Sequence, residues 1–383
     1  MDIMWYTPSK SSWRKGRLYK IEILCIVLII VLLIMAGMTF YVYKKNAMFL
    51  PALFGIGGFP KVEKDAYYDA EGHFRLGTKE DKMGFFMQHP IFGGFRHMYF
   101  NVEDNVLKAI APVKYKDFQQ AQGRADQIDA ALEAFHYLTG LVENGRAKLI
   151  SDFYSQDEIN KNPYKSHLTG MFYIGEKGKP FAVVVPGGGF ISNVTDCEGY
   201  PVAMKLHKMG YSVLVISYPV GKQLGETEQE KQGQAAAREL TQVIRYLTEH
   251  QKQLSIDMKD YAIFGFSAGG LMTTAFSFAN YEDCCHKNKL PRPKAIFPMY
   301  GLDWNIKALP QDKGLSFFSI VGRNDEFGFA KVEDKLPALK EMLGAENVTV
   351  KIIDGLGHGF GIGSETEVKN WLQEAVSFWE MHR

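Results

Sequence analysis

The sequence contains few cysteines, four in 383 residues, which excludes a small scaffold held together by disulfide bonds. Net charge is nearly absent too, because 44 Lys and Arg residues face 43 Asp and Glu residues for a formal sum of +1. The chain also lacks internal repeats, low-complexity runs and the G-x-G-x-x-G and Gly-Lys-Ser/Thr phosphate loops. What remains is a globular composition, since 46% of the residues are hydrophobic and can offset the entropy lost on ordering.

The small net charge hides an uneven distribution along the chain. Residues 1–45 carry seven Lys or Arg and two Asp or Glu, so the rest of the chain has a net charge of −4. A mildly acidic body offers no electrostatic footprint for DNA or RNA, so we expect no nucleic-acid partner.

The longest uncharged run, Ile23 to Tyr43 (ILCIVLIIVLLIMAGMTFYVY), lies near the N-terminus. As a helix it would span about 30 Å, the thickness of a bilayer core. A cleaved signal peptide is the alternative, but its apolar region would be about 7–15 residues long and would end in small residues. We therefore predict a cytoplasmic tail at residues 1–20 and a transmembrane signal anchor at residues 21–43.

The flanking charges predict how this anchor is oriented. Five Lys or Arg residues precede the span and two follow it. The positive-inside rule then leaves the tail in the cytoplasm and the body outside it. We expect a single-pass protein of the cell membrane whose catalytic domain is extracytoplasmic.

Residues 44–120 are predicted to be a juxtamembrane or cap segment, without an assigned role. An aromatic patch lies between Phe85 and Phe100. It would suit either a lid or membrane-surface contact, or simple packing onto the main domain, and we favour packing.

The remainder, residues 121–383, alternates short apolar runs with amphipathic stretches. Strands are predicted at residues 181–185, 211–217, 261–266, 295–299, 315–321 and 348–353. Helices are predicted at residues 125–143, 199–209, 231–253, 268–280, 332–343 and 365–381. Buried strands that alternate with helices indicate an α/β fold, a doubly wound and mostly parallel sheet covered on both faces. Ligand sites in such sheets lie beyond the carboxyl ends of the strands.

Three glycine-rich motifs fall at such strand ends. The first, Gly265-Phe266-Ser267-Ala268-Gly269, joins a predicted strand to a predicted helix, where a sharp turn would project the Ser267 hydroxyl as a nucleophile. The second, Pro186-Gly187-Gly188-Gly189-Phe190, follows strand 181–185. We predict that the backbone N–H groups of Gly188, Gly189 and Ala268 form an oxyanion hole.

The third motif, GLGHGFG at residues 355–361, supplies a candidate general base, His358. The matching acid should follow the preceding strand, where Asp325, Glu326 and Asp354 are the choices. Asp354 lies only four residues before His358 and would have to fold sharply back, and the longer Glu326 side chain loses more rotamer entropy. We therefore predict Asp325.

From about residue 150 onward the sequence resembles α/β hydrolases, specifically the bacterial acetyl-esterase branch related to hormone-sensitive-lipase-like enzymes and acetyl xylan esterases. The resemblance is carried by PGGGF at 186–190, EGYPVA at 198–203, GFSAGG at 265–270, VGRND at 321–325 and GLGHGFG at 355–361. It implies serine-dependent hydrolysis of short acyl esters, often acetyl groups on carbohydrates, without a cofactor. Pro186 replaces the histidine usual in the lipase branch and fits the acetyl-esterase branch.

Other functions share these residues. A thioesterase or a peptidase would use the same triad, although the chain lacks the repeats of a propeller peptidase. A non-catalytic, membrane-anchored interaction module would tolerate a damaged triad, yet all three members are present. Cys284-Cys285-His286 has no second ligand cluster to complete a metal site, so we expect vicinal surface cysteines and no metal.

Overall fold

The computed structural model describes residues 62–226, 229–279, 282–302 and 314–383, which belong to one compact unit. The predicted tail at 1–20 and anchor at 21–43 lie outside the described residues. Within the described residues, no helix has both the length and the apolar character needed to cross a membrane.

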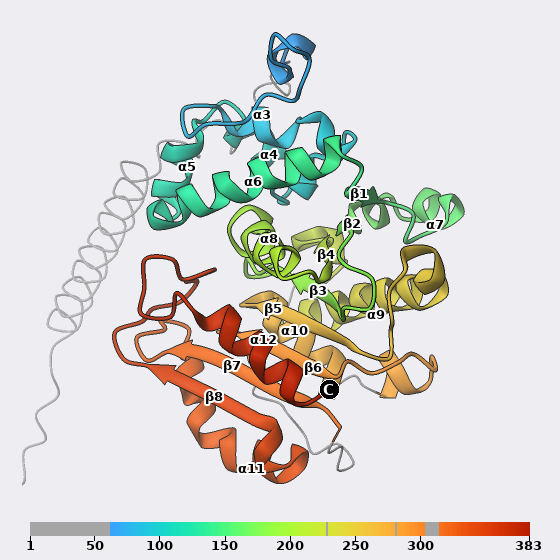
Figure 1. The fold of residues 1–383 in the computed structure, drawn as a ribbon, viewed down its shortest axis with the longest axis vertical. Helices are drawn as coiled ribbons and strands as arrows, with labels where there is room; N and C mark the ends of the chain where they lie inside the picture. Colours follow the sequence, from blue (N-terminus) through green and yellow to red (C-terminus); the bar gives the residue numbers. More distant parts are fainter. Residues whose placement is uncertain (1–61, 227–228, 280–281, 303–313) are drawn as a thin grey trace, which may run out of the picture. The chain divides into compact units, whose positions relative to one another are not determined.

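Eight strands of the described chain form one sheet in the order β1-β2-β4-β3-β5-β6-β7-β8 (Figure 1). The six strands from β3 to β8 pair in parallel, whereas β2 runs antiparallel to both of its neighbours, β4 and the edge strand β1. The strands are β1 (Ala147–Ile150), β2 (Thr169–Tyr173), β3 (Phe181–Val185), β4 (Ser212–Ser217), β5 (Tyr261–Phe266), β6 (Ala295–Met299), β7 (Ser316–Gly322) and β8 (Val348–Ile353). The prediction of a mostly parallel α/β sheet is therefore confirmed.

All six predicted strands are present, and β1 and β2 were not predicted. β1 has only four residues, and its central residues are exposed or half-buried. β2 contains Gly170, where a Cβ would overlap the Leu214 side chain of β4. A short edge strand and a strand interrupted by glycine both lack the continuous apolar run that identifies the central strands.

Helices cover both faces of the sheet, and α12 crosses it on the near side of Figure 1. Those after β2 are α8 (Tyr200–Lys208), α9 (Gln229–Leu254), α10 (Ala268–Thr274), α11 (Leu336–Leu343) and α12 (Trp371–Met381). Shorter π and 3-10 turns are η6 (Thr195–Gly199), η7 (Gly221–Leu224), η8 (Ala275–Ala279), η9 (Glu282–His286), η10 (Phe329–Lys335) and η11 (Ala345–Asn347).

The last helix begins six residues later than predicted, at Trp371 instead of residue 365. The intervening residues form turns. Thr366 explains the delay, because its hydroxyl donates to Gly363 O at 2.9 Å and accepts from Val368 N at 3.3 Å. Such side-chain bonds compete with the helical ladder.

The described part of the predicted cap segment folds into short helices. They are η1 (Lys64–Tyr67), α3 (Met83–Met87), η2 (Pro90–Phe92), η3 (Arg96–Met98), α4 (Asp104–Ile110), α5 (Tyr115–Ala121) and η4 (Ala125–Gln127). Three further elements lead into the sheet: α6 (Ile128–Glu143), α7 (Gln156–Lys161) and η5 (Pro163–His167).

The aromatic patch of this segment is core, as the packing interpretation expects. Phe86 and Phe92 are fully buried, and both rings contact Phe135 of α6. Phe92 also stacks on Tyr200 of α8, with ring centroids 6.0 Å apart. The segment therefore shares the hydrophobic core of the sheet domain.

The adjacent cysteines were predicted at the surface, and this prediction is wrong. Cys284 is 3% exposed and Cys285 is 0% exposed. They lie in η9, which packs against α9, and the Cys284 thiol lies 3.9 Å from Ala237 O. A free thiol behaves as a small apolar group, so burial is its usual state.

Candidate active site

Ser267 occupies the turn between β5 and α10. Its backbone has φ 49° and ψ −117°, a conformation that non-glycine residues rarely adopt and that costs about 1–3 kcal/mol. The turn is held by two hydrogen bonds: Ser267 N donates to Met299 O, and Leu271 N donates to Ser267 O, both at 3.0 Å.

Four glycines make room for this turn. A Cβ at Gly265 would overlap Gly269 O and the Thr273 side chain, and a Cβ at Gly269 would overlap Val185 O of β3. Across the turn, a Cβ at Gly301 would overlap Ser267 O, and one at Gly187 would lie 2.8 Å from the Ser267 Cβ. No larger residue fits at these positions. The two glycines of GFSAG, together with Gly187 and Gly301, are therefore needed to pack the chain around the strained serine.

The structure brings Ser267, His358 and Asp325 together. His358 Nε2 lies 2.8 Å from Ser267 Oγ, and His358 Nδ1 lies 2.7 Å from Asp325 Oδ2. The Asp325 side chain is fully buried, whereas that of His358 is 11% exposed. The second Asp325 oxygen accepts from Phe327 N at 2.9 Å, so both oxygens of the carboxylate are oriented.

The other two acid candidates point elsewhere. Asp354 accepts from Arg323 Nε at 2.6 Å, in an ion pair at the surface. Glu326 lines the pocket but is exposed, and no hydrogen bond joins it to His358 in the described residues. Among the three candidates, the geometry therefore selects Asp325.

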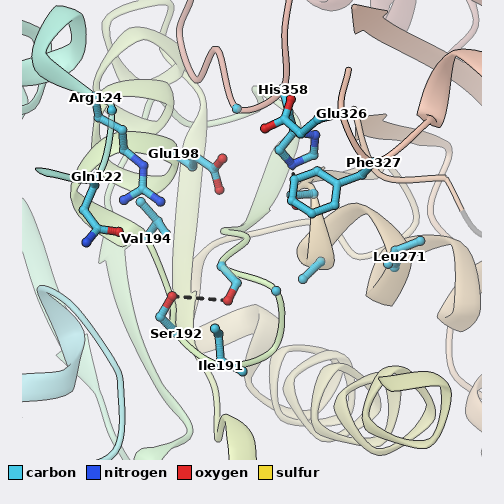
Figure 2. Close-up of a pocket in the computed structure, with 16 residues that line it drawn as sticks. Gln122, Arg124, Ile191, Ser192, Val194, Glu198, Leu271, Glu326, Phe327 and His358 are labelled. Atoms are coloured by element: carbon cyan, nitrogen blue, oxygen red, sulfur yellow. Dashed lines mark hydrogen bonds between the residues drawn. The ribbon is translucent and has the colours of Figure 1, made fainter. Parts of the chain in front are cut away.

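In the loop Gly187–Gly189, the carbonyl groups are hydrogen-bonded within the following turn, and the N–H groups of Gly188 and Gly189 point away from that turn. Gly187 O accepts from Val194 N at 3.1 Å, and Gly188 O accepts from Ser192 N at 3.0 Å. Ser192 Oγ also donates to Gly188 O at 3.2 Å, shown as the dashed line in Figure 2. Each following N–H points opposite to its carbonyl in a trans peptide, so the Gly188 and Gly189 N–H groups face away from these partners.

These amide groups are available to a ligand. Among the described residues, the N–H groups of Gly188, Gly189 and Ala268 donate no hydrogen bond. All three residues line the pocket that contains Ser267 and His358. Positive φ values of 125° and 64° at Gly188 and Gly189 explain why glycine is needed there.

The pocket has a volume of about 640 Å³ and two unlike walls. Figure 2 shows Gln122, Arg124 and Glu198 on one side and Glu326, Phe327 and His358 on the other. Ile191 and Phe327 are each 66% exposed although they are large and apolar. Among the described residues, no cluster of three or more His, Cys, Asp or Glu is placed to hold a metal ion.

Glu198 is a pocket residue that the sequence reasoning did not single out. It is 6% exposed, and its Oε2 accepts from Gly187 N at 2.7 Å. Its Oε1 accepts from Tyr300 Oη at 2.9 Å, and Tyr300 Oη in turn accepts from Gly361 N at 3.1 Å. Glu198 and Tyr300 thereby connect the Gly187–Gly189 loop to the loop that carries His358.

The Tyr300 ring also supports His358 directly, in edge contact at a centroid distance of 5.0 Å. Burial and the Glu198 carboxylate raise the pKa of the Tyr300 hydroxyl well above its usual range, so Tyr300 stays protonated and donates. The one available sequence signal was EGYPVA, which contains Glu198 but gives no indication of its partner.

Comparison with known proteins assigns the class. Residues 173–320 match a family model described as BD-FAE, an esterase-like α/β hydrolase domain. The match contains Ser267 and the Gly187–Gly189 loop and ends before Asp325 and His358. Curated proteins yield no significant match to the chain.

Solved structures with similar folds include three hydrolases. An acetyl ester-xyloside bifunctional hydrolase from Caldicellulosiruptor lactoaceticus is 22% identical, with a TM-score of 0.45 over 61% of this chain and 96% of its own. A thermophilic esterase from Thermogutta terrifontis is 15% identical, with a TM-score of 0.48 over 61% and 91%. A sugar hydrolase from Lactococcus lactis is 18% identical, with a TM-score of 0.41 over 56% and 94%. At TM-scores below 0.5, these likenesses carry no functional argument.

Residues 173–320 therefore form an α/β hydrolase domain of the esterase type, and the strand order of the described sheet agrees with this class. The enzyme class is that of the carboxylic ester hydrolases.

The geometry predicts that Asp325 and Glu326 respond differently to loss of charge. Asp325→Asn should keep the fold and lower kcat by about 10²–10⁴, because an amide no longer favours the required His358 tautomer. Glu326→Gln should reduce kcat far less. Steady-state ester hydrolysis measures kcat for both variants, and equal melting temperatures show that they fold alike. A larger loss in Glu326→Gln than in Asp325→Asn would contradict the choice of Asp325 as the acid.

A second prediction concerns the bridge between the two loops. Glu198→Gln offers one acceptor to two donors, so either Gly187 N–H or Tyr300 Oη–H loses its partner. We expect kcat to fall about tenfold with little change in KM, since a lost hydrogen bond to a charged group contributes about 1.5–3 kcal/mol. Tyr300→Phe should lower kcat by a similar factor. In the double variant, kcat should fall by less than the product of the two single-variant factors. Independent, multiplicative losses would argue against a shared network, and the exposed Glu365→Gln is the control.

Proposed function

We propose that this chain is a membrane-anchored serine esterase that removes short acyl groups, acetyl groups on carbohydrates in particular, through an acyl-enzyme. The observation that carries the proposal is the hydrogen-bonded series Ser267–His358–Asp325 at the edge of an open pocket. The N–H groups of Gly188, Gly189 and Ala268, which donate no hydrogen bond to any described residue, lie on the same pocket, where an oxyanion hole is required.

In the proposed first step, His358 Nε2 takes the proton from Ser267 Oγ as this oxygen attacks the ester carbonyl carbon. The carbonyl oxygen becomes an oxyanion that accepts from the N–H groups of Gly188, Gly189 and Ala268, each worth about 3 kcal/mol. Asp325 holds the imidazolium in its orientation. His358 then protonates the leaving alcohol, and the acyl group stays on Ser267.

In the second step, water replaces the alcohol. His358 Nε2 removes a proton from the water, whose oxygen attacks the acyl carbon, and the same amide groups stabilise the second oxyanion. His358 returns the proton to Ser267 Oγ, which releases the carboxylic acid. All of these transfers use groups present in the chain, so the proposed reaction needs no cofactor.

The substrate class is supported by the resemblance of PGGGF, EGYPVA and GLGHGFG to the acetyl-esterase branch. The pocket walls agree with it, because Gln122, Ser192 and Glu326 offer polar contacts for a hydroxylated substrate. Thioesters and peptides would meet the same triad, and no feature of the described residues favours either over an ester.

Covalent labelling tests the nucleophile. A fluorescent organophosphonate should label the full-length protein at Ser267, and Ser267→Ala should abolish both labelling and turnover of 4-nitrophenyl acetate. The same preparations should be assayed with acetylated sugars, thioesters and peptides. Labelling that persists in Ser267→Ala would contradict the nucleophile, and preference for a thioester or peptide would reassign the substrate.

The anchor at residues 21–43 and the extracytoplasmic position of the domain are part of the proposal, and they rest on the charge asymmetry of the sequence. Protease added to intact cells or spheroplasts should digest the domain and leave a small fragment that contains the anchor. A cytoplasmic protein serves as the control for lysis. A fully protected domain in unlysed cells would reverse the orientation.

A further inference from the structure

Arg124 reaches the pocket from a turn at the end of α5. Gly123 has φ 72°, and Arg124 N donates to Gln119 O at 2.9 Å, so the helix ends in a left-handed glycine turn. Three residues later, Gln127 Nε2 donates to Gly359 O at 2.8 Å, next to His358. This hydrogen bond fixes the turn against the loop that carries the proposed general base.

In the described part of the chain, the Arg124 guanidinium donates no hydrogen bond, and its interactions with Asp196 and Tyr300 are coulombic only. Its Nη1 is buried without a hydrogen bond, and no described carboxylate forms an ion pair with it. A buried donor without a partner costs about 1–3 kcal/mol, more when it is charged, so such a group needs an explanation. The residue lines the Ser267 pocket, where a bound ligand would satisfy it.

In the described part of the chain, neither of the two nearby buried carboxylates accepts a hydrogen bond from Arg124. Both oxygens of Glu198 accept hydrogen bonds, from Gly187 N and from Tyr300 Oη. Asp196 Oδ2 accepts from Gln119 Nε2 and Tyr115 Oη, whereas Asp196 Oδ1 is buried and accepts no hydrogen bond from the described residues. Burial raises the pKa of Asp196 to about 6 even though Arg124 acts in the opposite direction. Arg124 therefore acts on Asp196 through its charge, and no hydrogen bond to either carboxylate occupies its donors.

We propose that Arg124 binds a carboxylate group of the substrate, so that the preferred substrates are short-chain esters that bear one carboxylate. This inference rests on the proposed esterase function and names a further subsite of the same pocket. The guanidinium is a planar fork of donors with no acceptor, and a carboxylate matches it with two parallel hydrogen bonds.

The other residues of the pocket limit how many negative charges a ligand can carry and where on the ligand they can lie. Glu198 and Glu326 also line it, so a ligand with two negative charges, such as a phosphate dianion, meets repulsion. Figure 2 shows Arg124 on the side opposite Glu326 and Phe327. The carboxylate would lie at the Arg124 wall, and the uncharged part of the substrate at the exposed Phe327 ring.

The experiment compares charged and neutral esters of equal shape on the full-length enzyme. One pair carries the charge on the alcohol half (4-acetoxybenzoate and 4-acetoxybenzamide). The other carries it on the acyl half (mono-4-nitrophenyl adipate and the analogue in which its free carboxylate is a primary amide). In at least one pair, wild type should favour the carboxylate by about 10- to 100-fold in kcat/KM, the range expected for a charge-assisted hydrogen bond. The pair that responds shows which half Arg124 contacts.

Arg124→Gln should remove this preference, mainly through KM. Arg124→Lys should restore part of it, and added salt should weaken it in wild type. Arg146→Gln, an exposed arginine outside the pocket, is the matched control.

Two outcomes separate this inference from the proposed function. If 4-nitrophenyl acetate is hydrolysed but neither charged ester is preferred, or the preference survives Arg124→Gln, the carboxylate subsite is wrong and the esterase stands. If wild type hydrolyses no ester, the proposed function itself fails. Equal melting temperatures of the variants show that a change in kcat/KM does not arise from misfolding.

Discussion

The strained backbone at Ser267 is the constraint on which the rest of the site depends. A serine at φ 49° is maintained only because strand, helix and two neighbouring loops approach it at backbone distance. Gly187, Gly265, Gly269 and Gly301 permit that approach, since a Cβ at any of them would lie within 3.0 Å of neighbouring atoms. The energy stored in the turn is therefore balanced by packing of the central sheet, where β3, β5 and β6 are fully buried.

Hydrogen bonds then fix the surrounding loops relative to this serine. Glu198 connects the glycine loop after β3 to Tyr300, and Tyr300 connects to the loop after β8. One buried carboxylate therefore holds both the proposed oxyanion donors and the loop of the proposed general base. Both oxygens of this carboxylate accept hydrogen bonds, which offsets the cost of burying its charge.

Much of this arrangement could be predicted from the sequence, and the reasons are local. The central strands are continuous apolar runs, and Ser267, His358 and Asp325 each follow one of them on a loop with glycine. Carboxyl ends of parallel strands meet at one edge, so their loops converge without knowledge of long-range contacts.

The parts that could not be predicted depend on partners distant in sequence. Glu198 and Tyr300 are 102 residues apart, and neither lies in a pattern that indicates the other. Arg124 belongs to a turn whose direction is set by α5 and by Gln127. No periodic pattern in the sequence predicts that its side chain reaches the pocket. The burial of Cys284 and Cys285 follows from packing on α9, which a short polar stretch does not reveal.

The strand order also determines when and where catalytic competence arises. The serine lies in the middle of the sheet, whereas His358 follows β8, the edge strand, which is only half-buried along most of its length. During synthesis Ser267 is made 91 residues before His358, so under the proposed mechanism a nascent chain that has folded its central strands is still inactive. In the finished protein, fraying begins at edges with few buried contacts. Opening of the β8 edge would displace the loop that carries His358 and inactivate the enzyme, while the turn around Ser267 stays folded.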